Sequence, residues 1–311
     1  MSQIMEARLT EDFNASAEIY GVIHSKFRTA LNILFRMPGG GTRLITVITS
    51  GTKGIPDSIT VTEKYFAQLM FLPIGSKVLC KNYEFYFDSI FEVLKGNIQC
   101  LRQSTIVINN MSNDSVGLPN LTSYLIELKN HFTESYFNDK DSVLSSEQRM
   151  RMVEDLQCFS KAWLEKDYTK MESILLKLTG RGIGLTPSCD DALIGIIAVY
   201  TGARLYAKST AGITNQNLKA WIELIDIGSL TPFNRLLFNR TTDVSLKYLC
   251  CSQEERFSDV IIELVKAVFS DKEEDLRPYI YAVSLVGESS GRDMLFGMEI
   301  AYRELSKLLL F

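Results

Sequence analysis

Histidine is the scarcest ionisable residue in this chain of 311 residues, which contains only His24 and His131. Neither histidine lies near the serine and aspartate clusters of the sequence, so a Ser-His-Asp catalytic set is not indicated. The six cysteines show no C-x-x-C spacing, which supports neither a disulfide framework nor a zinc site. The apolar runs are also shorter than the roughly 18 residues that a membrane-spanning helix needs.

A strong positive charge is missing as well. The chain has 33 Lys and Arg residues against 37 Asp and Glu residues, a net charge of −4 at pH 7. Proteins that bind nucleic acids or membrane surfaces rely on clustered basic residues, so we expect neither partner. Residues 1–14 are polar and acidic, unlike a signal peptide. Composition therefore predicts a cytoplasmic globular protein, and 46% apolar residues allow a sizeable core.

What the sequence does contain is one motif that occurs twice. Residues 188–195 and 290–297 both follow the pattern Ser-x-x-Asp-x-Leu-x-Gly, and glycine precedes each copy. Serine is a frequent N-cap, and an acidic residue three positions later can complete a capping box. We therefore expect Ser188 and Ser290 to cap the starts of two helices.

The repetition predicts one site built from both copies. The free N–H groups and the positive dipole end of a helix N-terminus attract anions such as phosphate or carboxylate. Gly195 and Gly297 lie inside the predicted helices, where a glycine costs about 1 kcal/mol relative to alanine, so they indicate close helix packing. We expect the two N-termini to converge on one cavity. The alternative for either copy alone is a purely structural helix start.

The first copy carries two adjacent acids. Asp191 has the capping-box position and corresponds to Asp293, whereas Arg292 stands in the position of Asp190. Successive helical residues point about 100° apart, so we expect Asp191 to cap the helix and Asp190 to act on a ligand. Either carboxylate could be a base or a Mg²⁺ ligand. The sequence requires no cofactor, and Mg²⁺ is the one that these carboxylates would suit.

The same residues carry a family resemblance. Residues 182–195, Gly-x-Gly-Leu-Thr-Pro-Ser-x-Asp-Asp-x-Leu-x-Gly, resemble the Gly-x-Gly-Leu-Thr-Pro-Ser-Gly-Asp-Asp signature of the AllH family, typified by a subunit of oxamate carbamoyltransferase. Residues 287–297 are similar to that family's second signature. Gly-Ile-Pro-Asp-Ser-Ile at 54–59 is similar to a weaker third motif, so the resemblance covers most of the chain. Cys189 departs from the pattern, because the family has glycine there.

The resemblance implies a carbamoyltransferase subunit in purine or allantoin nitrogen catabolism that works with companion subunits. It would bind carbamoyl phosphate or an oxamate-like anion between the two signatures. A non-catalytic metabolite-binding or scaffold subunit is the alternative. The catalytic candidates are Asp190 and Asp191. The ligand-binding candidates lie in or beside the two signatures and are Arg181, Gly182, Gly184, Leu185, Thr186, Ser188, Ser289, Ser290, Gly291, Arg292 and Asp293.

The pattern of apolar residues predicts an α+β protein with two domains. Residues 1–112 are expected to form a β-rich barrel or sandwich, and residues 113–311 a mainly helical domain that carries both signatures. Predicted strands lie at 30–35, 44–49, 58–61, 77–79, 85–87 and 105–108. Predicted helices include 192–205, which is apolar on nearly all sides, 215–225 and 257–269. The glycines at 39–41 lack the Lys-Ser/Thr of a phosphate loop and predict a hairpin turn.

Overall fold

The computed structural model describes residues 4–9, 13, 18–81, 84–87, 90–94, 106, 123, 126–128, 145–209, 227–270 and 274–309. The chain divides into two compact units, Met1–Ser104 and Thr105–Phe311. The residues around the predicted boundary at 112 lie outside the described ones, so that boundary stays a prediction. The predicted strand at 105–108 and the predicted helix at 215–225 also lie outside them, apart from Ile106.

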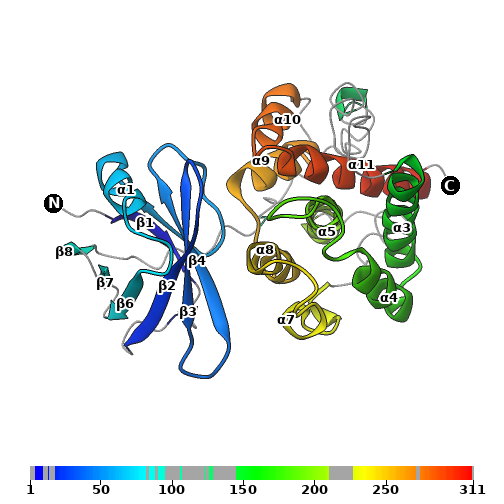
Figure 1. Cartoon of the computed structure of the whole chain (residues 1–311). Coiled ribbons are helices and arrows are strands. Elements are labelled where there is room, and N and C mark those ends of the chain that lie inside the picture. The colour runs from blue at the N-terminus through cyan, green and yellow to red at the C-terminus, as the bar shows by residue number, and fades with distance from the viewer. Residues whose placement is uncertain are drawn as a thin grey trace. The chain divides into compact units, whose positions relative to one another are not determined.

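The N-terminal unit is built on one eight-stranded sheet with a half-barrel form (Figure 1). The strand order is β1-β5-β4-β3-β2-β6-β7-β8. Every neighbouring pair is antiparallel except β4 and β5, which are parallel. The strands are β1 (Ile4–Arg8), β2 (Ile19–Lys26), β3 (Ala30–Arg36), β4 (Thr42–Thr49), β5 (Ser58–Val61), β6 (Lys77–Lys81), β7 (Glu84–Phe87) and β8 (Ile90–Leu94).

Alternation along the strands builds the core of this unit. Leu31, Ile33 and Phe35 of β3 point to the same face and are fully buried. Phe35 packs edge-on against both Phe13 and Phe85, with ring centroids 5.5 and 6.0 Å away. The helix α1 (Glu63–Met70) adds an apolar face to the same core. The glycine run after β3 forms the predicted hairpin turn into β4.

The C-terminal unit is helical, which confirms the predicted order of a β-rich domain followed by a mainly helical one. Its long helix α5 (Ser188–Ser209) packs against α3 (Ser146–Leu164), α8 (Asp243–Gln253), α9 (Asp259–Val268) and α11 (Ser290–Leu309). The remaining elements are α4 (Tyr168–Leu178), η2 (Ile227–Ser229), α7 (Phe233–Leu236) and α10 (Arg277–Ser284). Figure 1 shows α5 at the centre of these helices.

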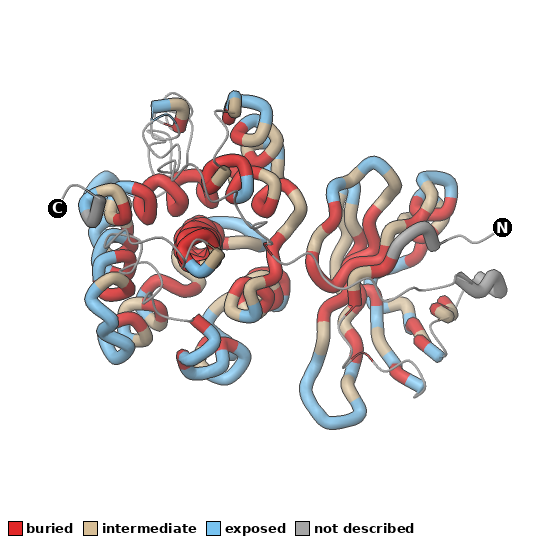
Figure 2. The backbone as a smooth tube through the Cα atoms, turned by 180° about the vertical axis from the view of Figure 1, so that it is seen from behind, coloured by how far each residue is buried: buried red, intermediate tan, exposed pale blue. Residues whose placement is uncertain are grey.

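The sequence of α5 explains its central position. Nearly all of its residues are buried, and the tube of this helix is red along most of its length in Figure 2. Small residues let neighbouring helices approach: a Cβ at Gly202 would lie 2.4 Å from Val265 of α9. An apolar helix with such small residues suits a buried position and not a surface. The expectation of a buried central helix is confirmed.

Candidate functional site

The two signatures meet in the structure. The Thr186 hydroxyl, just before α5, lies 2.7 Å from the hydroxyl of Ser290, the first residue of α11. This hydrogen bond joins positions 104 residues apart in the chain. The two helix N-termini therefore lie next to each other, as predicted, whereas the cavity that they were expected to share stays a prediction.

The glycines of the two signatures pack reciprocally. A Cβ at Gly195 on α5 would lie 2.0 Å from the carbonyl oxygen of Met294 on α11. A Cβ at Gly297 on α11 would lie 1.9 Å from the carbonyl oxygen of Ala192 on α5. Each glycine lies four residues after the aspartate of its own copy of the motif, Asp191 or Asp293. Each one contacts the residue that directly follows the aspartate of the other copy. The two helices are thus related by an approximate twofold symmetry, with glycines where the backbones touch.

The helix starts differ by one residue from the predicted ones. The Asp191 N–H donates to the Pro187 carbonyl at 3.2 Å, and the Asp293 N–H donates to the Ser289 carbonyl at 3.0 Å. Pro187 and Ser289 are therefore the N-caps. Ser188 and Ser290 are the first helical residues of α5 and α11. Proline has neither a side-chain acceptor nor an N–H, so a capping box cannot form at α5. The prediction that Asp191 caps this helix was wrong.

Asp190 stabilises the fold through three hydrogen bonds. Its carboxylate accepts hydrogen bonds from the Gly180 N–H at 2.8 Å, the Ser245 hydroxyl at 2.6 Å and the Thr241 hydroxyl. The side chain is fully buried, and burial raises its pKa while these three donors act in the opposite direction. Asp190 therefore joins the start of α5 to the turn before it and to α8.

The second acid, Asp191, has no such partners. Its side chain is fully buried, and neither carboxylate oxygen makes a hydrogen bond with any described residue. Burial raises its pKa well above the ordinary value, and the negative charges of Asp293 and Asp190 raise it further. The hydroxyls of Ser290 and Thr186 lie near enough to act in the opposite direction. A buried acid with unused oxygens thus lies where the two signatures meet.

The turn before α5 presents backbone N–H groups. Gly182 and Gly184 have positive φ angles of 122° and 97°, which side chains other than glycine rarely adopt. Ile183, Gly184 and Leu185 are exposed, and among the described residues their N–H groups find no acceptor. The Leu185 carbonyl accepts a hydrogen bond from Thr242, the N-cap of α8. The hydrogen bond from Thr242 therefore holds the turn in place, and the backbone N–H groups of its exposed residues remain available as donors.

The two predicted basic residues point to protein acceptors. The Arg181 guanidinium pairs with Asp155 of α3 at 3.1 Å and is half-buried. The Arg292 guanidinium donates to the Glu288 carbonyl in the turn before α11. The charge of Arg181 is thus paired with a carboxylate of α3. The hydrogen bond of Arg292 holds its guanidinium beside the second signature.

Cys189 faces the protein core. Its side chain is fully buried in the main apolar cluster of the helical unit, and burial raises the pKa of its thiol. A thiol needs a lowered pKa and access to solvent to react as a nucleophile. Cys189 therefore has the surroundings of a core residue and not those of a nucleophile.

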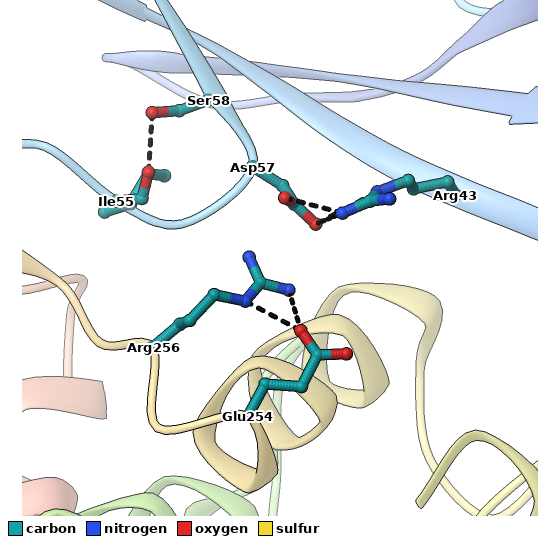
Figure 3. Close-up of polar contacts among 6 residues, drawn as sticks. All are labelled: Arg43, Ile55, Asp57, Ser58, Glu254 and Arg256. Atoms are coloured by element: carbon teal, nitrogen blue, oxygen red, sulfur yellow. Dashed lines mark hydrogen bonds and ion pairs between the residues drawn. The ribbon is translucent and has the colours of Figure 1, made fainter. Parts of the chain in front are cut away.

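The weaker third motif lies in the N-terminal unit. Asp57 is buried, has a positive φ of 51°, and receives a hydrogen-bonded ion pair from Arg43 at 2.9 Å (Figure 3). The next residue, Ser58, donates to the Ile55 carbonyl at 2.6 Å. These contacts close the turn that leads into β5, so they account for this motif by folding alone.

Two protein-family models match this chain. The oxamate carbamoyltransferase subunit AllH matches residues 178–302, and the AllH family N-terminal domain matches residues 2–100. The chain belongs to the AllH family. Its family name indicates an oxamate carbamoyltransferase subunit. Searches of curated proteins and of solved structures found no match.

The AllH match spans both signatures and the residues that contact them. Thr241 and Ser245, which donate hydrogen bonds to Asp190, lie outside both signatures and were not among the candidate site residues. Their signal in the sequence is a polar run before an apolar helix, and Thr242 takes the capping role there.

In the helical unit, Arg256 bonds to Glu254 at 2.7 Å (Figure 3). No helix among the described residues is long and apolar enough to span a membrane.

Proposed function

We propose that this AllH-family chain is the carbamoyltransferase subunit that binds a small anion where α5 and α11 begin. The anion would be carbamoyl phosphate or an oxamate-like amide. The observation that carries the proposal is the 2.7 Å contact between the Thr186 and Ser290 hydroxyls. It brings together two helix N-termini, and the positive ends of their dipoles favour a negative charge.

The chemistry that suits this arrangement is positioning and charge stabilisation. In carbamoyl transfer a nucleophile attacks the carbamoyl carbon, and the phosphate leaves with additional negative charge. Fixed N–H donors such as those of Ile183 and Gly184 would stabilise that charge without rearrangement. Asp191 is the carboxylate left to act at the ligand, because three donors already occupy Asp190.

Companion subunits have a specific part in this proposal. Arg181 is paired with Asp155, so the first signature has no uncommitted arginine to meet a phosphate in a bidentate contact. A companion subunit would supply that group, in keeping with the word subunit in the family's name. We therefore expect little turnover from the single chain and carbamoyl transfer after the companion subunits are added.

The test combines binding with reconstitution. Carbamoyl phosphate and oxamate are titrated into the full chain by calorimetry, with Thr186→Val and Ser290→Ala as site variants. Ser284→Ala is the matched control, because its half-buried hydroxyl donates to the Tyr281 carbonyl of its own helix. Each site variant should weaken binding by up to about tenfold, the scale of one lost hydrogen bond. Rapid carbamoyl transfer by the single chain, or full affinity in both site variants, would contradict the proposal.

A non-catalytic metabolite-binding or scaffold subunit is the second candidate. It is supported by the reciprocal packing of Gly195 and Gly297 and by the structural bonds of Asp190, which explain much of both signatures without a ligand. The reconstituted assembly separates the two candidates. If Thr186→Val and Ser290→Ala assemble normally and leave turnover unchanged, the scaffold reading holds.

A further inference from the structure

The fully buried carboxylate of Asp191 is the starting observation. Neither of its oxygens has a hydrogen-bond partner among the described residues. Burying an ionised carboxylate without donors or a countercharge costs several kcal/mol or more. A bound cation or a proton would therefore stabilise this carboxylate in its buried position.

The surroundings of Asp191 are rich in oxygen. Asp293, also fully buried, lies near enough for its charge to act on Asp191, and the Thr186 and Ser290 hydroxyls are neighbours too. Asp190 adds a third carboxylate, but its oxygens are occupied by three donors. Two buried acids, one from each signature, thus interact beside a pair of hydroxyl groups.

We propose that Asp191 and Asp293 bind one divalent cation of the Mg²⁺ type where α5 and α11 meet. Oxygen donors select hard cations such as Mg²⁺ and Mn²⁺ over zinc. Mg²⁺ is commonly held by one or two carboxylates and keeps water or phosphate oxygens as further ligands. Among the described residues no group of three or more His, Cys, Asp or Glu could hold a metal, so the further ligands of this cation would be hydroxyl and water oxygens.

The approach to this site is through the hydroxyl pair. Thr186 and Ser290 are half-buried while Asp191 is fully buried. A cation would pass these hydroxyls and break their mutual hydrogen bond, after which both oxygens could turn toward it. The inference does not rest on the proposed transferase function, because the cation can be measured without any substrate.

The experiment uses Mn²⁺ as the probe for the full-length chain. Free Mn²⁺ is followed by electron paramagnetic resonance in the parent protein and in Asp191→Asn and Asp293→Asn. Asp259→Asn, at the first turn of α9, is the matched control. Loss of even an outer-shell partner lowers metal affinity about 10- to 100-fold, so each site variant should lose at least about tenfold while the control keeps parental affinity.

Thermal unfolding checks that the variants are folded. Ligands that bind only the folded state raise the melting temperature, so Mn²⁺ or Mg²⁺ should raise that of the parent and of Asp259→Asn but not of the two site variants. Both site variants should still unfold cooperatively without metal. The proposal is overturned if the parent binds no Mn²⁺, or if folded Asp191→Asn binds it with parental affinity.

Discussion

Gly297 lies directly on the backbone of Ala192, so close that a Cβ would come within 1.9 Å of the alanine carbonyl oxygen. The same contact occurs in reverse between Gly195 and Met294. Both glycines belong to the repeated pattern and were expected to mark close packing. Because the atoms in contact are backbone atoms, no rotamer change can relieve an added methyl group.

Gly297→Ala should therefore destabilise the helical unit strongly. Overpacking of a core costs about 1–3 kcal/mol, and we expect the upper end of that range or more, because the backbone of α5 would have to move. Thermal unfolding followed by circular dichroism measures the effect. Gly39→Ala is the control, since a Cβ there meets nothing within 4 Å and φ is not in the left-handed region. Equal melting temperatures for the two variants would refute the packing argument.

The two adjacent acids should differ in the opposite sense to that expected from the sequence. Asp190→Ala leaves three donors without an acceptor. Unsatisfied buried groups cost about 1–3 kcal/mol each, so we expect a loss of about 3 kcal/mol. Asp191→Asn removes no hydrogen bond and should stay within about 1 kcal/mol of the parent. Chemical denaturation of both variants decides this, and a larger loss for Asp191→Asn would reverse the assignment.

Cysteine reactivity provides a separate check of the first signature. Cys158 is exposed, whereas Cys189 is buried with a raised pKa. In the native protein, iodoacetamide at mildly alkaline pH should label Cys158 and leave Cys189 unlabelled until denaturant is added. Peptide mass spectrometry measures both sites in one sample. Labelling of Cys189 at the rate of Cys158 would mean that the start of α5 opens in solution.

The third motif makes a prediction for the N-terminal unit. Asp57 is buried and paired with Arg43, so Arg43→Met leaves a buried charge without its partner. Breaking a buried pair costs about 3–5 kcal/mol, and we expect the low end because the arginine is partly exposed. The control is Lys81→Met, whose exposed pair with Glu18 is screened by solvent, so its unfolding midpoint should stay close to that of the parent. Similar unfolding midpoints for the two variants would argue against a structural role for this motif.

The fold and the convergence of the signatures could be predicted from local patterns. Short apolar and β-branched runs predicted β3 and β4, and the long apolar run after Asp191 predicted the buried α5. The repetition of serine, acid and glycine predicted two equivalent helix starts in one place. These features depend on short-range periodicity and on chemistry that each copy carries by itself.

The roles within the site could not be predicted in the same way. Whether an acid is satisfied depends on donors that come from elsewhere in the chain, such as Thr241 and Ser245 for Asp190. A shift of one residue in the helix start also moved Asp191 out of the capping position, because Pro187 and not Ser188 accepts the first helical bond. Tertiary contacts and exact helix boundaries are the parts that sequence periodicity leaves open.

The two glycine contacts between α5 and α11 have a further consequence for how a ligand would be received. The close backbone packing at both glycines leaves little room for either helix to shift toward the other, so we expect the geometry of their N-termini to be preorganised. A ligand that bound there would lose little affinity to ordering the helices. Because the turn of Ile183 to Leu185 is also held by the hydrogen bond from Thr242, we expect a ligand to bind there without a slow conformational step.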